Sequence, residues 1–452
     1  MNIIIAGSGK VGSTLVRLLG AEGHDLTLID LSQTRLESIV EQHDVMAVGG
    51  NCASMGVLKE AGIQDADLLI AVTGQDEVNL LSCMTAHGIN PKLHTIARIR
   101  NPEYTDQIHS MRDLFALSMT VNPEKQAALE MERLIRFPGF LRRDSFAKGR
   151  AEIVELRVDE NSRLKDVSLI EMYRIVKCRV LVCAVLRGGK AITPGGNFVL
   201  RSGDRIFVTA PTSNLATLLK NLEIGTHRVK KCLIGGGGRA SYYLAQLLEK
   251  DGIRVKILEK DPERCRVLAS ALEQTDIIHG DFSNRKDLEA AGLHDCDAFL
   301  SLSGIDEINM VTSLYAASQG VRQVITHLSR AENSMLAGGM SIGSIICPRE
   351  LCSNDIVRYV RAMENQTGAA ISVHGIADGN AEAVEFLADA STKYLGTPLK
   401  ELKIRPNVLI ASISHSGKVE IPHGASTISE GDSVVVVTTE RGAIDTLNDI
   451  FA

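Results

Sequence analysis

The sequence of this 452-residue chain repeats itself, and the repeat constrains the fold more than any other feature. An apolar run and the cluster Gly7-Ser8-Gly9-Lys10-Val11-Gly12 open the first half. The second half opens alike, with Gly236-Gly237-Gly238-Arg239-Ala240-Ser241. An acidic residue follows each cluster, Asp30 in the first half and Glu259 in the second, a shift of 229 residues. Because chance does not produce such ordered agreement, we interpret the chain as a duplicated structural unit.

Short apolar runs alternate with helix-period stretches inside each repeat. In the first half the runs 3–6, 26–29, 45–48, 68–72 and 95–99 are predicted to be buried strands. One apolar helix face lies between the first two, with Gly23 as its C-cap. Strand and helix in alternation indicate parallel strands joined by right-handed crossovers. We therefore predict an α/β fold with two Rossmann-type, doubly wound parallel-sheet domains. The residues of the predicted helix face are Val11, Leu15, Leu18 and Leu19, repeated as Ala240, Leu244, Leu247 and Leu248.

A different pattern follows each α/β module. Residues 153–158 alternate with period two, and residues 180–192 contain a Gly188-Gly189 turn typical of a hairpin. Residues 408–421 repeat the hairpin around Ser416-Gly417. Each Rossmann-type domain is thus expected to precede a small α+β C-terminal domain. The predicted domains are residues 1–140, 141–225, 226–369 and 370–452.

Composition excludes several classes of protein. The chain is 44% hydrophobic and 23% charged, as globular proteins are, and its net charge of −6 argues against nucleic-acid binding. No apolar run approaches the roughly 20 residues that cross a bilayer, and the N-terminus lacks the features of a signal peptide, so we expect a cytoplasmic protein. The nine scattered cysteines and the twelve histidines show no metal-ligand or disulfide spacing, so no metal site is assigned.

The first glycine cluster has the context of a dinucleotide site. It follows a strand, opens a helix and precedes Asp30 by 18 residues, counted from Gly12. In such a fold Gly7 permits the tight turn, Gly9 lets a pyrophosphate approach the backbone, and Gly12 lets the helix pack close to the strand. Asp30 is expected to accept hydrogen bonds from ribose hydroxyls. A bound adenine nucleotide is the favoured interpretation, and a vestigial or structural turn is the alternative.

The second cluster departs from this pattern at two positions. Ser241 replaces the third glycine and should loosen the contact between helix and strand, while Glu259 keeps a carboxylate at the ribose position. We expect nucleotide binding here too, without requiring the same nucleotide.

Further candidates lie where later strands end, because open α/β sheets bind ligands there. Arg98 is placed to balance phosphate charge, with a surface salt bridge as the alternative, and its second-half counterpart is taken to be Leu328. We therefore expect unequal ligands at the two sites. The other candidate cofactor-binding residues are Asn51, Cys52, Thr73 and Gly74 in the first half and Gly280, Asp281 and Ser303 in the second.

Two charged motifs receive structural interpretations. The pairs Asp76-Glu77 and Asp306-Glu307 resemble catalytic carboxylates, but an acidic residue before a helical run predicts helix capping. A basic stretch is predicted to be a solvated face or linker, with contact to a partner or to membrane headgroups as the alternative. That stretch comprises Arg133, Arg136, Arg142, Arg143, Lys148 and Arg150, around Phe137-Pro138-Gly139-Phe140.

Over its whole length the chain resembles the TrkA family of bacterial potassium-uptake regulators. The resemblance is carried by the first glycine cluster, Asp30, Ala71-Val72-Thr73, Ala97-Arg98 and their second-half counterparts. It implies NAD(H) as ligand, with ATP or ADP as further candidates. It also implies a homotetrameric ring, peripheral at the inner face of the membrane, that gates a Trk-type potassium transporter. Two departures are noted, Asn51 in place of a common aspartate and Leu328 in place of an arginine.

Two other functions remain open on the sequence. A nicotinamide-dependent oxidoreductase would carry the same glycine motif, but it would also need a substrate domain with a proton donor or acceptor near the nicotinamide. A scaffold with inactive sites is the second alternative. We assign no catalytic residue.

Overall fold

The computed structural model describes residues 1–137, 139–224, 228–330, 340, 342–364, 370–440, 442, 444 and 446–452. Within these residues the chain forms two compact units. One unit comprises Met1–Ala128 and Cys347–Val360, and the other comprises Leu129–Ile346 and Arg361–Ala452. The predicted domain boundaries near residues 225 and 370 adjoin segments 225–227 and 365–369, which lie outside the described residues. All the predicted boundaries stay predictions.

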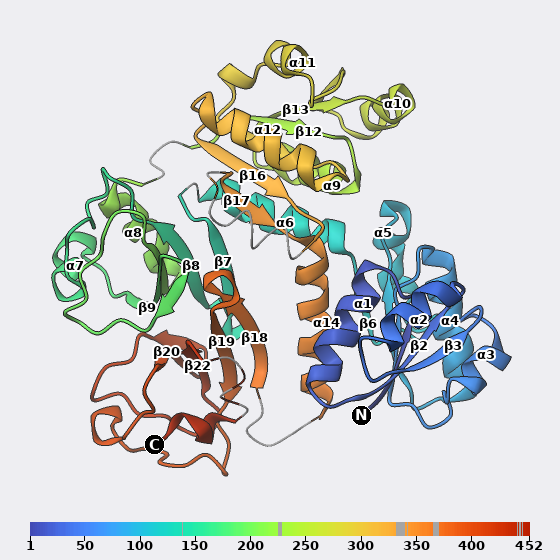
Figure 1. Ribbon diagram of the computed structural model, residues 1–452, viewed down its shortest axis with the longest axis horizontal. Helices are drawn as coiled ribbons and strands as arrows, with labels where there is room; N and C mark the ends of the chain where they lie inside the picture. The colour runs from blue at the N-terminus through green and yellow to red at the C-terminus, as the bar shows by residue number, and fades with distance from the viewer. Residues whose placement is uncertain are drawn as a thin grey trace. The chain divides into compact units, whose positions relative to one another are not determined.

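The first module is a six-stranded parallel sheet in the order β3-β2-β1-β4-β5-β6, with helices packed on it (Figure 1). This is the dinucleotide-fold order, in which the order of successive strands reverses between β1 and β4 while all strands stay parallel. The five strands predicted in this module are confirmed. The bounds are β1 (Asn2–Ala6), β2 (Asp25–Asp30), β3 (Met46–Gly49), β4 (Leu68–Ala71), β5 (His94–Arg98), β6 (Met119–Val121), α1 (Lys10–Ala21), α2 (Gln33–Val40), α3 (Met55–Glu60), α4 (Asp76–Ile89) and α5 (Pro102–Met111).

The predicted face of α1 packs against this sheet. Val11, Leu15 and Leu19 are buried, and Leu18 lies at the margin of the contact. Gly23 follows the helix with φ +80° and donates its backbone N–H to the Gly20 carbonyl at 3.1 Å. It therefore ends the helix as expected, because positive φ favours glycine.

The second module repeats the first, with strand order β14-β13-β12-β15-β16-β17. All its strand pairs are parallel. The duplication predicted from the sequence is therefore a duplication of the fold. The bounds are β12 (Lys231–Gly235), β13 (Arg254–Glu259), β14 (Asp276–His279), β15 (Ala298–Ser301), β16 (Gln323–His327), β17 (Ser344–Ile346), α9 (Arg239–Lys250), α10 (Pro262–Ala271), α11 (Arg285–Ala290) and α12 (Asp306–Ser318).

Two five-stranded antiparallel sheets form the small domains, ordered β10-β9-β11-β8-β7 and β18-β19-β22-β20-β21. Both predicted hairpins are present. The two sheets share one apolar core and lie in the same unit. The bounds are β7 (Arg142–Phe146), β8 (Ala151–Arg157), β9 (Leu181–Arg187), β10 (Lys190–Ile192), β11 (Arg205–Pro211), α7 (Leu169–Val176), α8 (Thr212–Leu222), β18 (Ala370–Ile376), β19 (Ala381–Leu387), β20 (Val408–His415), β21 (Lys418–Glu420) and β22 (Ser433–Thr438).

Two long helices are shared between the units. Helix α14 (Pro348–Glu364) follows the second sheet, yet its first turns belong to the unit of the first sheet. There its Tyr359 hydroxyl lies 3.1 Å from His94 Nδ1 of β5. Helix α6 (Pro123–Arg136) does the reverse, and the Leu134 carbonyl accepts a 2.7 Å hydrogen bond from Gln323 of β16. Each parallel sheet therefore receives part of a helix that follows the other sheet.

The predicted solvated face holds for part of the basic stretch, because Arg133, Arg136 and Arg150 are exposed, but it is wrong for Arg143. Arg143 is buried, with Nη2 2.6 Å from a Glu152 oxygen and its guanidinium 4.6 Å from the centre of the Phe137 ring. Arg136 contacts Asp251 at 2.6 Å. Pro138 and the side chain of Lys148 lie outside the described part of the chain. A guanidinium can be buried when a carboxylate neutralises it, which a count of charges along the sequence does not reveal.

One carboxyl group on α6 makes stability depend on pH. Burial raises the pKa of Glu130 to about 7, despite Arg133 at 3.5 Å. Because the folded pKa exceeds the unfolded value of about 4.3, folding takes up a proton, and stability falls as pH rises toward 7. We expect Glu130→Gln to raise unfolding free energy at pH 8 by on the order of 1–2 kcal/mol, with a smaller gain at pH 6.

Urea unfolding at both pH values measures this difference. Exposed Glu41 provides the control, as Glu41→Gln should show no such pH-dependent gain. An equal effect of Glu130→Gln at pH 6 and pH 8 would contradict the assignment.

Candidate functional site

Close packing fixes the turn between β1 and α1. Gly7 adopts φ +109°, and a Cβ added there would lie 2.9 Å from the Thr73 backbone nitrogen. A Cβ on Gly12 would lie 1.8 Å from the Gly7 carbonyl oxygen. Neither position can hold a side chain without displacing backbone, as the sequence predicted. The first turn of α1 is thereby pressed against the end of β1.

Open space surrounds the middle glycine of the same cluster. Gly9 is the N-cap of α1, and a Cβ built on it would meet no atom within 4 Å. Its carbonyl accepts the Ser13 N–H at 2.9 Å, which closes the first turn. The N–H groups before Ser13 have no partner inside the helix, and the helix dipole adds partial positive charge. An anionic group can therefore approach the backbone at this position.

Asp30 stands beside this turn at the end of β2. Its Oδ2 accepts 2.7 Å hydrogen bonds from both the N–H and the hydroxyl of Ser8, and its Oδ1 accepts the Ser32 N–H at 2.8 Å. Burial acts to raise the pKa of Asp30, but these hydrogen bonds outweigh it and hold the pKa below its usual value. An ionised carboxylate has about four acceptor positions, and three are used here. One remains for an incoming hydroxyl group.

A buried asparagine organises the neighbouring strand ends, and the sequence analysis did not identify it. Asn79 Oδ1 accepts the Thr73 N–H at 2.8 Å and the Thr73 hydroxyl at 2.7 Å, while its Nδ2 donates to the Arg98 carbonyl at 2.8 Å. Asn309 makes the equivalent bonds to Ser303 and to the carbonyl of His327. The recurrence of the asparagine two residues after each acidic pair was the available signal.

The aspartate of each acidic pair does not cap its own helix. Asp76 is buried, and its Oδ2 accepts the backbone N–H groups of Arg100 and Asn101, each at 2.7 Å. Asp306 accepts the N–H of Ser329 at 2.8 Å and that of Arg330 at 3.0 Å. Each carboxylate thus holds the loop that follows the next strand. The capping prediction is wrong for these two side chains, because a helix start read locally cannot show which distant N–H groups face it.

Arg98 forms no ion pair with any residue that the structure describes. Its guanidinium donates to the Thr73 carbonyl, and its Nε is buried without a hydrogen-bond partner among the described atoms. Burial lowers the pKa of Arg98, and the nearby Arg100 lowers it further. The alternative of a surface salt bridge is thus not observed. A partly buried cation without a carboxylate partner, at the end of β5, favours an anionic ligand.

The second glycine turn makes the same bond between a backbone N–H and a carboxylate, but with different side chains. The Gly237 N–H donates to Glu259 Oε2 at 2.5 Å, as Ser8 does to Asp30. A Cβ on Gly237 would lie 3.0 Å from Glu259 Cγ and 2.6 Å from Leu268 Cδ1. The longer glutamate therefore requires a glycine where the shorter aspartate allows a serine. Gly238, like Gly9, has open space on its Cβ side.

Ser241 stands where the first half has Gly12. Its hydroxyl is fully buried and donates to the Gly236 carbonyl at 2.6 Å. That carbonyl corresponds to the Gly7 oxygen, against which no Cβ fits in the first half. The two turns thus differ in how closely helix and strand pack, in the sense expected from the sequence.

The counterpart of Arg98 is His327 and not Leu328. His327 ends β16 as Arg98 ends β5, and its Nδ1 lies 3.0 Å from the Ser303 carbonyl, as Arg98 contacts the Thr73 carbonyl. Leu328 is buried in a separate small apolar cluster. Asn309 follows its counterpart Asn79 by 230 residues, whereas Gln323 follows its counterpart His94 by 229, so the second half is one residue shorter between these positions. The second site thus has an imidazole at this position.

The remaining predicted residues use their side chains for local hydrogen bonds or for packing. Asn51 and Asp281 each accept the backbone N–H two residues later, at 3.0 and 2.9 Å, and so shape their own turns. Cys52 is 4% exposed, and its sulfur accepts the Ser82 hydroxyl at 3.1 Å inside the core. Gly280 packs against Leu258, and a Cβ there would lie 3.0 Å from Leu258 Cδ1.

Arg264 is a site residue that sequence reasoning missed. Its Nε donates to the Gly237 carbonyl at 2.6 Å, so the guanidinium of Arg264 lies beside the second glycine turn. Burial lowers the pKa of Arg264, while Glu259 opposes that shift. The other predicted residues lie near the glycine turns or strand ends. The first turn of α1 contains Lys10 and Val11, the first turn of α9 contains Arg239 and Ala240, and the loop after β4 contains Gly74.

Metal-binding clusters and membrane-spanning helices are both absent from the described residues. No group of three or more His, Cys, Asp or Glu side chains in these segments is arranged to hold a metal ion. No helix in the same segments is long and apolar enough to cross a bilayer.

Comparison with known proteins gives a consistent result over the full length. The TrkA-N domain model matches residues 3–123 and 232–348, and the TrkA-C domain model matches residues 153–223 and 383–452. The chain is 32% identical over 451 residues to a Trk system potassium uptake protein TrkA homolog from Archaeoglobus fulgidus, covering all of both chains. It is 30% identical over 460 residues to the Trk system potassium uptake protein TrkA of Haemophilus influenzae, covering 100% of this chain and 98% of that one.

A solved structure shares the fold. The structure named "GsuK channel bound to NAD" aligns with a TM-score of 0.61 at 16% identity, covering 97% of this chain and 77% of that chain.

The packing at the first turn leads to a stability prediction. Gly12→Ala should lower the unfolding free energy by about 1–3 kcal/mol, because its methyl group would overlap the Gly7 carbonyl. Gly9→Ala places the same methyl group in open space and should change stability by less than about 1 kcal/mol. Urea unfolding of the two variants compares these effects directly. Equal midpoints for Gly12→Ala and Gly9→Ala would contradict the geometry.

Proposed function

The chain belongs to the TrkA family of potassium-uptake proteins, and from this premise we propose that it is a nucleotide-sensing regulatory subunit. In this proposal the first glycine turn binds NAD(H), with ATP or ADP as competing ligands. The partner is a Trk-type membrane potassium transporter. The protein works in the cytoplasm, peripheral to the inner face of the membrane, and nucleotide binding gates potassium uptake.

One observation carries the proposal, namely the arrangement of three groups around the first turn. An open helix N-terminus lies at Gly9, an ionised carboxylate at Asp30, and a partly buried cation without an ion-pair partner at Arg98. They match a diphosphate joined to a ribose, since N–H groups and a guanidinium bind phosphate oxygens and a carboxylate binds hydroxyl groups. A carboxylate at this position repels a 2′-phosphate and so disfavours NADP-type ligands.

The second turn supports binding of a different ligand or a different affinity. It offers the same open helix N-terminus at Gly238, but with Glu259, Arg264 and His327 around it. Unequal sites suit a sensor, because a ligand shifts a conformational equilibrium only through unequal affinity for the two states.

A regulatory role is favoured over catalysis because the chain repeats the α/β module and its small sheet domain. The small sheets that follow each turn share one apolar core, and the strand ends near Arg98 are held by backbone contacts of Asn79 and Asp76. An oxidoreductase would need a proton donor or acceptor presented to the nicotinamide.

Incubation with NADH and a panel of carbonyl substrates should produce no NADH oxidation, and substrate-dependent turnover would favour the enzyme.

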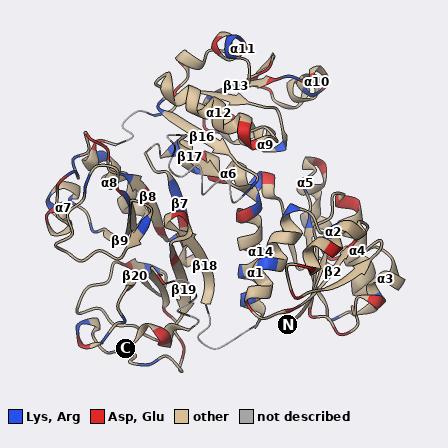
Figure 2. Cartoon of the chain, viewed as in Figure 1, with Lys and Arg blue, Asp and Glu red and all other residues tan. Residues whose placement is uncertain are grey.

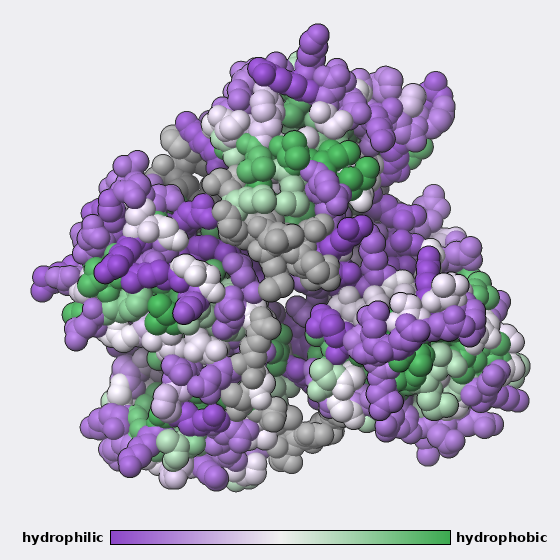
Figure 3. All heavy atoms as spheres, viewed as in Figure 1, coloured by the Kyte–Doolittle hydropathy of each residue, from purple (hydrophilic) through white to green (hydrophobic). Residues whose placement is uncertain are grey.

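Self-association into a ring is proposed from a repeated surface feature. Helix α4 exposes Leu81 and Met84, which are 51% and 46% exposed, and α12 exposes Val311 and Leu314 at the corresponding positions, at 65% and 38%. Figure 3 shows hydrophobic side chains gathered over α12. Residues three apart lie on one helix face, and such apolar faces mark protein contacts. A homotetramer would use one such face from each module of every subunit.

Nucleotide binding at the first turn is tested by calorimetry on the full chain. Asp30→Ala should weaken NADH binding about 10-fold or more, because a charge-assisted hydrogen bond is lost. Gly9→Val should also weaken binding, because its side chain fills the space that a phosphate needs. The matched second-half variants, Glu259→Ala and Gly238→Val, should leave the tighter NADH isotherm unchanged. Unchanged affinity for NADH and for ATP in both first-half variants would overturn the assignment.

The proposed assembly is tested by light scattering. Replacing both Leu81 and Met84 with glutamate should lower the molar mass in solution, since charge on a buried interface is costly. Leu114, which is 61% exposed and lies outside this face, provides the control variant Leu114→Glu. A wild-type chain that is already monomeric, or an unchanged mass in the double variant, would refute this interface.

A further inference from the structure

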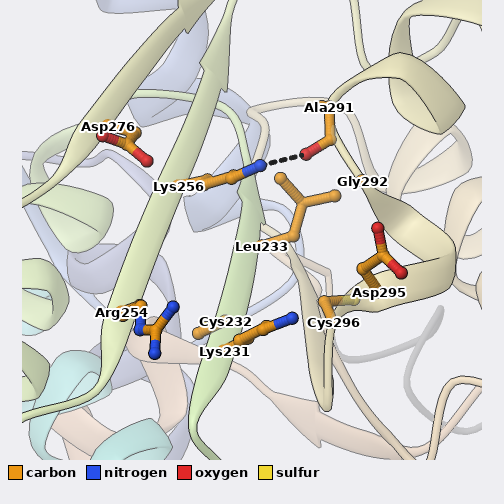
Figure 4. A pocket seen from close by; sticks show the side chains of 10 residues that line it. All are labelled: Lys231, Cys232, Leu233, Arg254, Lys256, Asp276, Ala291, Gly292, Asp295 and Cys296. Carbon is orange, nitrogen blue, oxygen red and sulfur yellow. Dashed lines mark hydrogen bonds between the residues drawn. The ribbon is translucent and has the colours of Figure 1, made fainter.

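The second α/β module contains a cavity far from its glycine turn. The cavity has a volume of about 240 Å³ and lies at the amino ends of β12, β13 and β14 (Figure 4). The glycine turn follows the carboxyl end of β12, so it lies at the opposite ends of the strands of the same sheet. Ten residues line the cavity, namely Lys231, Cys232, Leu233, Arg254, Lys256, Asp276, Ala291, Gly292, Asp295 and Cys296.

Strand register brings three cations to this cavity. Lys231 pairs with Arg254 across β12 and β13, and Leu233 pairs with Lys256. Paired residues of neighbouring parallel strands point to the same side of a sheet, and residues two apart on one strand do so as well. The three cationic side chains therefore lie on one face, with the apolar side chain of Leu233 between them.

These cations are only partly neutralised within the protein. Among the residues that the structure describes, no carboxylate lies within ion-pair distance of Lys231 or Arg254. Lys256 donates to the Ala291 carbonyl at 3.2 Å (Figure 4). Asp276, which pairs with Lys256 across β13 and β14, and Asp295 also line the cavity, so three cations and two carboxylates leave one net positive charge. The backbone colouring in Figure 2 marks both basic and acidic positions in this module.

The internal repeat shows that the fold does not require this charge. The positions that correspond to Lys231, Arg254 and Lys256 in the first half are Asn2, Asp25 and Thr27. The same strands pair in the same register there without a single cation. Three like charges repel one another across adjacent strands, which costs stability unless an anion binds.

We propose that this cavity binds a compact anion carrying two or more negative charges, such as a small phosphorylated or polycarboxylate metabolite. A compact ligand suits a cavity of about 240 Å³ better than an extended one does. Leu233 and the Cys296 side chain provide an apolar floor for the carbon portion of the ligand. The site is independent of the glycine turns and of the nucleotide proposed there.

The test is calorimetry with pyrophosphate and with citrate as separate probes. The full chain is first saturated with NADH and ADP, so that the glycine turns are filled. The variant carries Lys231→Asn, Arg254→Asp and Lys256→Thr, which are the first-half residues at these positions and therefore fit the same strand pairing. The control carries the same charge change at exposed sites elsewhere, with Lys418→Asn, Arg322→Asp and Lys393→Thr.

We expect saturable binding of at least one probe to the wild-type chain and to the control. The triple cavity variant should bind about 10-fold more weakly or worse, while its NADH affinity stays unchanged. Preference for pyrophosphate or for citrate identifies the phosphorylated or the carboxylate source.

Three outcomes overturn the proposal. These are no saturable binding of either probe by the wild type, equal binding by the cavity variant, and an equal loss in the control variant. Binding confined to an acidic peptide such as oligoglutamate, and lost in the cavity variant, would also overturn it, because the surface would then recognise a macromolecule. Loss of NADH binding in the Asp30→Ala variant bears only on the first turn and leaves this test intact.

Discussion

The contact between a strand end and a helix start, with no side chain between them, is the constraint on which both modules depend. Gly12 lies so close to the Gly7 carbonyl that even a methyl group would overlap it. This contact directs the first N–H groups of α1 toward open space at Gly9. Where the contact is looser, as at Ser241, a hydroxyl group fills the gap and bonds the same carbonyl. A binding surface therefore results from a packing requirement.

Buried polar side chains hold the loops around that surface. Asn79 accepts the Thr73 N–H after β4 and donates to the Arg98 carbonyl at the end of β5, and Asp76 accepts N–H groups of the loop after β5. Unpaired buried N–H and carbonyl groups are costly, so these loops have one favourable arrangement. Asn79 makes its hydrogen bonds to protein atoms, whereas Arg98 has a buried Nε without a hydrogen-bond partner among the described residues. A cation with donor capacity to spare therefore lies where an anionic ligand is expected.

Duplication allows the two modules to diverge while the fold is kept. Asp30 with Ser8 and Glu259 with Gly237 make the same backbone bond through side chains of different length. At the amino ends of the strands, the second module has three cations at positions where the first module has none. The copies therefore retain backbone geometry and differ in the charges around it, so the two halves can respond to different ligands.

The sequence alone determined the duplication, the alternation of strands and helices in both modules, the two hairpins and the glycine turns. These features rest on local periodicity and on backbone conformations that only glycine adopts readily, and both can be read from neighbouring residues. The tertiary structure alone decided that His327 and not Leu328 matches Arg98, that Asp76 holds a distant loop, and that α6 and α14 are shared between the units. It also brought three cations from two strands to one cavity. Such contacts depend on strand register and on small deletions inside helices, which the local sequence pattern does not record.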